Sequence, residues 1–310
     1  MSDVMSITFS HLQGDAMSVP LATVKIGQFS ESPHLAIARA LDMGAQHGID
    51  WVTERVASSP AQFESLRTGE LDLAITSPDN VLMYATTAGN PLKEQLDLQI
   101  LRPIDRGLGL ALYTSASVKS PADFSGMSLG VDVMSSGFAL LLLQMLQSIG
   151  VNRADLVFEA IGATPKRLGA IREGLVVGSI LNAETAVAAE EAGLVKWATS
   201  TEIDSNYLGT VLANISGVQS ETTRSFLNMW EEVTQVIINS DSKHVKDLLE
   251  VYAPKLATDR YVEILKSPEF GVISGESISV DQLTVLAKIR ERSGAYTPPE
   301  AELEKLAAHA

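Results

Sequence analysis

An internal repeat constrains the fold of this chain more than any other feature. Residues 24–79 align with residues 129–184 without a gap, at a constant offset of 105 positions. Each copy opens with an apolar, strand-like stretch that ends in a serine, Ser30 in the first copy and Ser135 in the second. Apolar residues at helical spacing follow, and a second strand-like stretch comes next. This order predicts a β-α-β-α-β unit that occurs twice.

The turn and helix-end signals of the two copies also correspond. The second helix of each copy is expected to begin at an N-cap residue followed by proline, at Ser59 and at Thr164. The same helices are expected to stop at Gly69 and Gly174. Any two β-α-β-α-β segments share part of this pattern, so an accidental likeness is the alternative. The preferred interpretation is two homologous lobes, each a parallel sheet with helices on both faces.

The segments outside the repeat predict how the lobes are joined. Residues 99–113 are interpreted as one crossover strand and residues 207–214 as the return strand. The pattern from residue 220 onward is helical, and these helices should complete lobe one and brace the second lobe. The main predicted helices cover residues 222–239, 242–252, 258–266 and 280–292.

The predicted fold class is therefore α/β, with two Rossmann-like lobes, a hinge and a central cleft. Lobe one is expected to comprise residues 1–103 plus 209–310, and lobe two residues 104–208. Glycine and proline in the crossing segments are compatible with a hinge.

The carboxyl ends of the parallel strands identify the expected binding loops. Ligands of open α/β sheets bind beyond these ends, where the following helices present unpaired N–H groups. This rule selects the following ligand-binding residues: Ser30, His34, Ser59, Ser77, Asp79, Asn80, Ser135, Ser136, Asn182 and Glu184. For each serine the alternative is plain helix capping. Asp79 and Glu184 either compensate a helix dipole or bind an amine or cation.

Charge and hydropathy exclude two classes of partner. The net charge of −15 and the lack of a basic cluster argue against nucleic acid. The longest apolar run, residues 138–143, is too short to cross a bilayer, so membrane insertion is not expected. Residues 1–21 lack the basic and apolar regions of a signal peptide. The protein is expected to be cytoplasmic if Met1 is its natural start, and periplasmic if a signal peptide has been removed.

The residue types needed for several chemistries are missing or scattered. The chain has no cysteine, which removes disulfides, thiolate nucleophiles and cysteine zinc sites. Its five histidines show none of the short pairings typical of a metal site, so neither a metal nor a cofactor is expected. His34, near the start of a predicted helix, is the candidate acid or base if the cleft is catalytic.

Three segments resemble the NMT1/THI5-like group of substrate-binding proteins. In SSPAQFESLRTGELDLAITSPDN (58–80), Gly69 and Asp72 match the turn into the third strand of that group. SPADFSGMSLGVD (120–132) and the segment 135–174 resemble parts of its second lobe. The resemblance covers about residues 24–215, and Val177 replaces the aspartate of the second copy of the turn. It implies a type II periplasmic-binding-protein fold.

The group includes the binding components of sulfonate, taurine, nitrate and thiamine-precursor ABC importers. The resemblance thus implies a solute-binding protein that closes around a small polar or anionic organic molecule for an ABC importer. Its expected partners are that ligand and an ABC permease. The same fold also houses soluble enzymes, so the alternative is a cytoplasmic, cofactor-independent decarboxylase-like or lyase-like enzyme acting on a small organic acid. The binding protein is favoured because no catalytic constellation is apparent.

Overall fold

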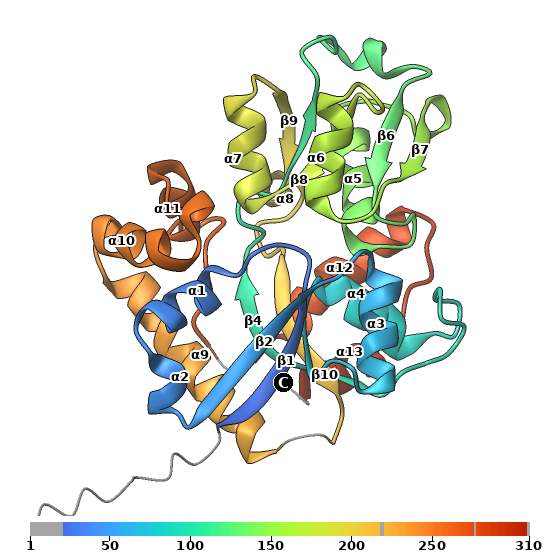
Figure 1. Cartoon of the computed structure of the whole chain (residues 1–310). Helices are drawn as coiled ribbons and strands as arrows, with labels where there is room; N and C mark the ends of the chain where they lie inside the picture. The colour runs from blue at the N-terminus through green and yellow to red at the C-terminus, as the bar shows by residue number, and fades with distance from the viewer. Residues whose placement is uncertain (1–20, 218–219, 276, 309–310) are drawn as a thin grey trace, which may run out of the picture.

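The computed structural model describes residues 21–217, 220–275 and 277–308, and its strands form one five-stranded sheet in each of two lobes (Figure 1). The sheet of lobe one contains β1 (Ala22–Gln28), β2 (Ile49–Arg55), β3 (Leu73–Thr76), β4 (Leu98–Asp105) and β10 (Thr210–Ile215). The sheet of lobe two contains β5 (Ala111–Thr114), β6 (Ser128–Val131), β7 (Val157–Ala160), β8 (Gly178–Leu181) and β9 (Val195–Thr199). The predicted two-lobed α/β fold is confirmed.

Both sheets follow the same plan. The order β2-β1-β3-β10-β4 in lobe one corresponds to β7-β6-β8-β5-β9 in lobe two. The first three strands of each order are parallel, and the fourth runs antiparallel to both of its neighbours. The helices also correspond: α1 (Pro33–Ala40), α3 (Ser59–Thr68) and α4 (Pro78–Thr86) match α5 (Gly137–Ser148), α6 (Thr164–Arg172) and α7 (Ala183–Glu191). The β-α-β-α-β unit predicted from the repeat occurs in both lobes.

The helix starts differ from the prediction by one residue. In α3 the N-cap is Ser58, whose extended backbone lets its side chain accept the N–H of Ala61, and Ser59 is already helical. In α6 the N-cap is Ala163, which has no side chain that could cap. The predicted stop is observed at Gly69, which ends α3 with a left-handed φ of 74°.

The first crossing is two strands rather than one. Strand β4 continues to Asp105, and β5 begins in the other sheet at Ala111. Between them Gly107, Leu108 and Gly109 have φ values of 106°, 50° and 73°. Left-handed backbone at three successive residues cannot continue a strand. The expected single strand over 99–113 is therefore wrong, and the chain passes from one sheet to the other at this break.

The C-terminal third is helical, as predicted. It contains α9 (Glu221–Asn239), α10 (Ser242–Tyr252), α11 (Asp259–Leu265), α12 (Val280–Arg292) and α13 (Glu300–Ala308). Helix α11 contacts α7 of lobe two, and α12 packs against both α4 and α5. Shorter helices are α2 (Met43–Gln46), α8 (Ser200–Ile203) and 3-10 turns at Pro121–Phe124, Arg153–Asp155 and Pro254–Leu256.

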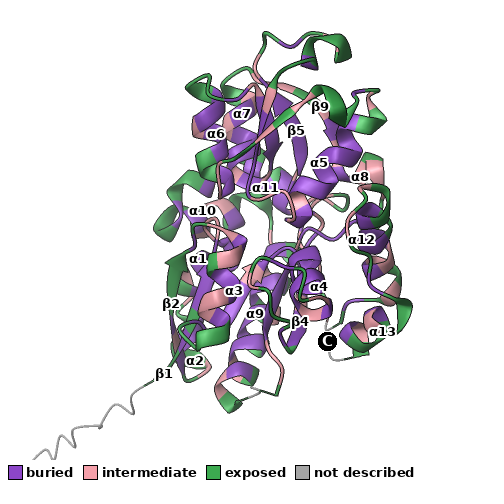
Figure 2. Ribbon diagram, turned by 90° about the vertical axis from the view of Figure 1, so that its right-hand side faces the viewer, coloured by how far each residue is buried: buried purple, intermediate pink, exposed green. Residues whose placement is uncertain are grey.

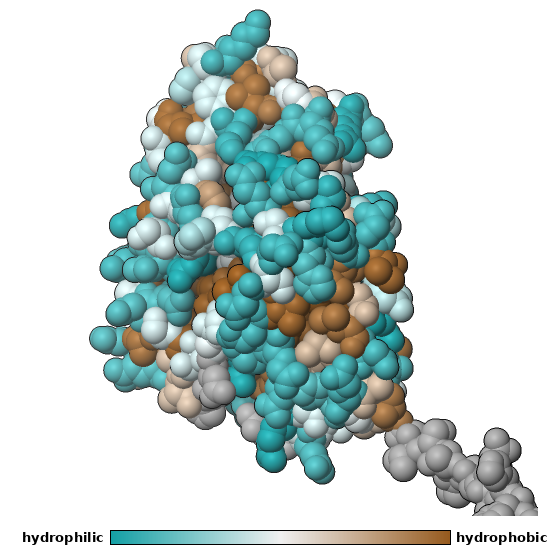
Figure 3. Space-filling view, turned by 90° about the vertical axis from the view of Figure 1, so that its left-hand side faces the viewer, coloured by the Kyte–Doolittle hydropathy of each residue, from teal (hydrophilic) through white to brown (hydrophobic). Residues whose placement is uncertain are grey.

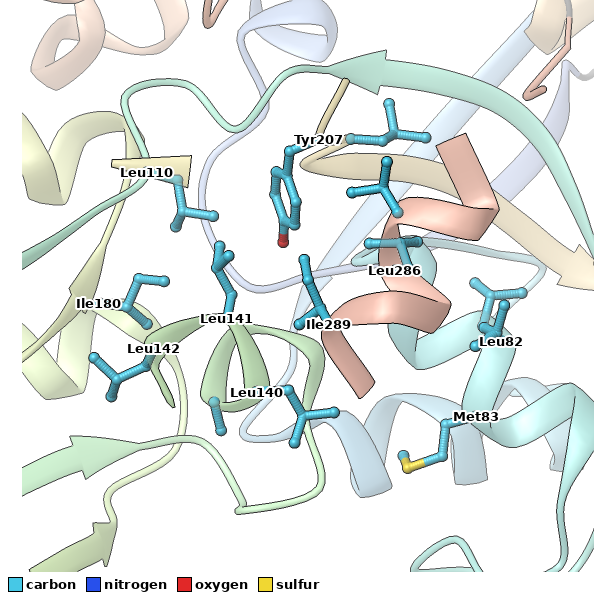
Figure 4. Packing of buried hydrophobic residues seen from close by; sticks show 14 of the residues in the cluster. Leu82, Met83, Leu110, Leu140, Leu141, Leu142, Ile180, Tyr207, Leu286 and Ile289 are labelled. Carbon is cyan, nitrogen blue, oxygen red and sulfur yellow. The ribbon is translucent and has the colours of Figure 1, made fainter. Parts of the chain in front are cut away.

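One apolar cluster extends through both lobes. Leu82 of α4, Leu141 of α5 and Ile289 of α12 belong to it, and Figure 4 shows these side chains with Tyr207 close to Leu141 and Ile289. Burial of apolar surface is the main favourable term in folding. The buried residues in Figure 2 accordingly run through the centre of both lobes. The lobes therefore share part of their core on the side of α5 and α12.

The surface is mostly hydrophilic. Figure 3 shows the face that carries α10, where polar groups predominate and apolar groups gather across the middle. Val251 and Tyr252 at the end of α10 are among the exposed apolar residues. Among the described helices, none is both long and apolar enough to cross a membrane. Residues 1–20, examined above for a signal peptide, lie outside the described residues.

Candidate binding cleft

A cleft of about 910 Å³ lies between the lobes, part of it open to solvent. Its polar lining follows the carboxyl ends of parallel strands in both sheets: Ser30 after β1, Ser77 after β3, Asp132 after β6 and Asn182 after β8. Apolar side chains supply much of the remaining lining, including Phe29, Ile75, Ile104, Leu108, Phe138, Tyr261 and Val272.

The structure brings together six of the ten sequence-predicted residues. The six that line the cleft are Ser30, His34, Ser77, Asn80, Ser136 and Asn182. The four that do not line it are Ser59, Asp79, Ser135 and Glu184. Glu184 lies behind Ser30, with which its side chain is hydrogen-bonded, and burial raises the pKa of its carboxyl.

Asp79 has a structural partner instead of a ligand. Its Oδ2 accepts a hydrogen bond from Arg290 Nη1 of α12 at 2.7 Å, and both side chains are only 3% exposed. Burial nevertheless raises the pKa of Asp79, against the opposing effect of the guanidinium. A buried charge left without its partner is costly, so this pair fixes α12 against the start of α4.

Two of the predicted serines cap helices, as the alternative interpretation had it. Ser77 Oγ accepts the N–H of Asp79 at 3.3 Å, and Ser136 Oγ accepts the N–H of Ala139 at 3.4 Å. Both serines still line the cleft, so the capped ends of α4 and α5 form part of its wall.

His34 is almost completely buried at the wall of the cleft. Its ring stacks on Trp230 with 4.3 Å between ring centroids, and its Nε2 lies 3.1 Å from the hydroxyl of Thr234. Burial lowers the pKa of His34 to about 3, so the ring is neutral near pH 7. Such a low pKa makes it a weak proton acceptor, and a proton carrier of the enzyme alternative would need a pKa closer to neutrality.

Arg167 is a cleft residue that the sequence analysis missed. It lies on α6, is 2% exposed, and donates hydrogen bonds to Ser179 Oγ, Thr164 Oγ1 and the carbonyls of Gly162 and Ile180. Burial lowers its pKa to about 10, which leaves it charged at neutral pH. Its place one turn after the Thr164-Pro165 helix start was the available signal.

Asp105 was also missed, and it ties the two crossings together at the cleft. Its carboxylate accepts hydrogen bonds from the N–H of Gly107, at 2.7 Å, and from the hydroxyl of Thr210. Burial raises its pKa to about 6. Gly209 passes so close that a Cβ there would lie 2.4 Å from Asp105 Oδ1. These contacts hold the end of β4 against the start of β10.

Direct contacts show that the two lobes are closed against each other in this structure. Asp132 Oδ2 of lobe two accepts the N–H of Ser59 of lobe one, at 3.1 Å. Asn80 Oδ1 of lobe one accepts the N–H of Gly137 of lobe two, at 3.2 Å. The N–H of Ala163 donates to the carbonyl of Ala57 at 3.3 Å. The ends of α3, α4 and α5 therefore meet across the cleft.

The described residues include no cluster of three or more His, Asp or Glu side chains suited to a metal ion.

No protein-family model and no curated protein sequence matches the chain. Solved structures do match. The alkanesulfonate-binding protein SsuA from Xanthomonas axonopodis pv. citri, bound to MOPS, has a TM-score of 0.72 at 14% identity, over 93% of this chain and 99% of that one. This chain has the periplasmic-binding-protein fold.

Other structures agree with that assignment of the fold. The periplasmic nitrate-binding protein NrtA from Synechocystis PCC 6803 has a TM-score of 0.73 at 11% identity, covering 92% of this chain and 86% of that one. The periplasmic aliphatic sulphonate binding protein SsuA from Escherichia coli has a TM-score of 0.64 at 15% identity, covering 90% and 94%. At this low identity the likeness shows the fold, and the solute must be argued from the cleft.

Proposed function

We propose that this protein binds one small polar or anionic organic molecule between its lobes and serves an ABC importer. The observation that carries the proposal is the cleft, because its lining comes from both lobes and the facing loops are hydrogen-bonded to each other. A solute held there contacts both lobes at once, so its binding favours the closed arrangement. The named functions of the similar structures, which bind sulfonates or nitrate, support the same class.

The partner and the compartment belong to the same proposal. The similar Staphylococcus aureus structure is described as the ligand-binding component of an ABC-type import system, and the nitrate-binding and Escherichia coli proteins as periplasmic. By analogy we propose that this protein delivers its solute to an ABC permease and that it works in the periplasm. Fractionation of the cells that make the protein tests the compartment.

A thermal-shift screen followed by mass spectrometry tests the proposed function. The screen contains nitrate, alkanesulfonates, carboxylates, amines and amino acids. A solute at 100 times its dissociation constant stabilises the folded protein by about 2.7 kcal/mol. A binding protein returns the hit chemically unchanged. Chemical conversion of the hit would show that the protein is an enzyme instead. A screen without any hit would contradict solute binding.

Two variants locate the binding site. Ser30→Trp fills the cleft from its wall, so the hit should no longer stabilise that variant. Ser125→Trp introduces the same side chain at an exposed position outside the cleft and should leave the stabilisation intact. Equal stabilisation of both variants would move the binding site elsewhere.

A further inference from the structure

Three buried polar atoms of cleft residues have no hydrogen-bond partner within the described part of the chain; besides the hydroxyl of Tyr261, which can donate or accept, two of them are acceptors only. One is Oδ1 of Asp132, whose other carboxylate oxygen accepts the N–H of Ser59. The second is Nδ1 of His34. Both residues line the cleft. Because an unpaired buried acceptor costs free energy, these atoms indicate that the bound molecule supplies a donor.

The hydrogen bonds around His34 assign its proton. The hydroxyl of Thr234 donates to the carbonyl of Trp230 at 2.9 Å, so it can only accept from His34. Nε2 of His34 therefore carries the hydrogen, and Nδ1 is a bare acceptor. The neutral ring cannot offer a positive charge to an anion.

The one positive group of the described lining is largely engaged by the protein itself, and its charge also acts on Asp132. In the described lining Arg167 is the one Lys or Arg side chain, and four of its five N–H groups donate to lobe two. Three carboxylates, those of Glu31, Asp105 and Asp132, line the same cleft. The excess of negative charge opposes a plain oxyanion.

One N–H group at the start of each of three helices beside the cleft is engaged as well. The N–H groups of Ser59, Gly137 and Ala183, at the starts of α3, α5 and α7, donate to Asp132, to Asn80 and to the carbonyl of Leu108. Helix N-termini attract anions through such N–H groups when they are unpaired. In the closed arrangement these three are unavailable to a sulfonate or nitrate.

We propose that the solute carries an ammonium or other N–H group that donates to Oδ1 of Asp132, and that Asp132 selects amine-bearing molecules over oxyanions. This inference rests on the proposed function and narrows its solute class. The apolar side chains of the lining, such as Phe29 and Phe138, contact the carbon skeleton of the solute.

Calorimetric titration with matched probes tests the inference. Benzylamine carries N–H donors, benzyltrimethylammonium has the same charge without them, and phenylmethanesulfonate is an anion on the same skeleton. The corresponding butyl compounds provide a second skeleton. Each amine should bind at least about tenfold more tightly than the trimethylammonium compound and the sulfonate on the same skeleton, as expected for a hydrogen bond to a charged group. Any hit of the thermal-shift screen should likewise carry an N–H group.

Asp132→Asn keeps an acceptor for Ser59 but places an NH₂ group or a neutral oxygen where the free carboxylate oxygen was. The preference for amines should disappear in this variant. Asp155→Asn makes the same change at an exposed carboxylate outside the cleft and should keep the preference. If Asp132→Asn does not fold, the comparison of amine with trimethylammonium on the wild-type protein decides alone.

The outcomes separate the two proposals. Sulfonates or nitrate that bind as tightly as amines, or a preference that survives in Asp132→Asn, would overturn the role of Asp132 and leave solute binding intact. Failure of every probe and of every screened solute would overturn the proposed function and this inference together.

Discussion

When the lobes are closed, no space is left for a side chain at Gly137, at the start of α5. A Cβ there would lie 2.5 Å from Asp79 Cβ and 2.8 Å from Ser77 Oγ of the other lobe. Asp79 cannot retreat, because Arg290 holds its carboxylate at 2.7 Å. Gly137→Ala should therefore disfavour closure by the cost of overpacking, about 1–3 kcal/mol. That cost corresponds to a loss of solute affinity of about 5-fold to 150-fold.

Pulsed electron spin resonance measures the effect on closure directly. The chain has no cysteine, so Val52→Cys and Val157→Cys place one spin label on each lobe, at exposed positions of β2 and β7. The solute selected by the screen should shorten the label distance in the parent and fail to do so fully in Gly137→Ala.

A matched substitution controls for the change of glycine to alanine itself. Gly169 is also helical, in α6, and a Cβ there would meet nothing within 4 Å. Gly169→Ala should close like the parent and bind with the parent's affinity. If Gly137→Ala closes as fully as Gly169→Ala and binds equally well, the steric reasoning is refuted.

Three further predictions concern stability, each measured by urea unfolding. Arg290→Met leaves Asp79 buried without its partner and should cost about 3–5 kcal/mol, most of which the double variant with Asp79→Leu should recover. Thr234→Val removes the acceptor for His34 and should cost about 1–3 kcal/mol, whereas Thr234→Ser should stay near wild type. Asp105 has its pKa raised to about 6, so its contribution to stability is present below about pH 4 and is lost as the pH rises through 6. Asp105→Asn should therefore gain about 3 kcal/mol relative to the parent between pH 4 and pH 7. An unchanged free energy of unfolding in Arg290→Met would contradict the role of the ion pair. Equal stability of the two Thr234 variants would contradict the hydrogen bond to His34. A stability difference between Asp105→Asn and the parent that does not change with pH would contradict the raised pKa of Asp105.

The sequence predicted those parts of the fold that depend on local signals. Apolar spacing and the glycine at position 69 are local, and they located strands and helices of the repeat. The break between β4 and β5 was missed because Leu108, a residue that rarely adopts a left-handed φ, occupies its centre. Hydrogen bonding of the crossing segment to Gly271 and Phe270 determines that conformation, and such distant partners leave no local pattern.

The same distinction applies to the cleft. Polar residues after strand ends could be selected by rule, and Ser30 and Asn182 do line the cleft. Asp79 could not be separated from a ligand contact, because its partner Arg290 is 211 residues away in sequence. Asp132 and Arg167 could not be selected from the sequence, because their burial and their hydrogen bonds depend on the folded arrangement of the lobes.

The position of β10 also determines the order in which the protein can be made. All strands of lobe two come from the continuous stretch 111–199, so this lobe has its complete sheet once that stretch has left the ribosome. In lobe one, β10 lies between β3 and β4, although it is synthesised after both. Until residues 210–215 emerge, β3 and β4 have no strand between them, and each carries an open edge that invites mispairing. The lobe that begins the chain is thus the last to be finished during translation.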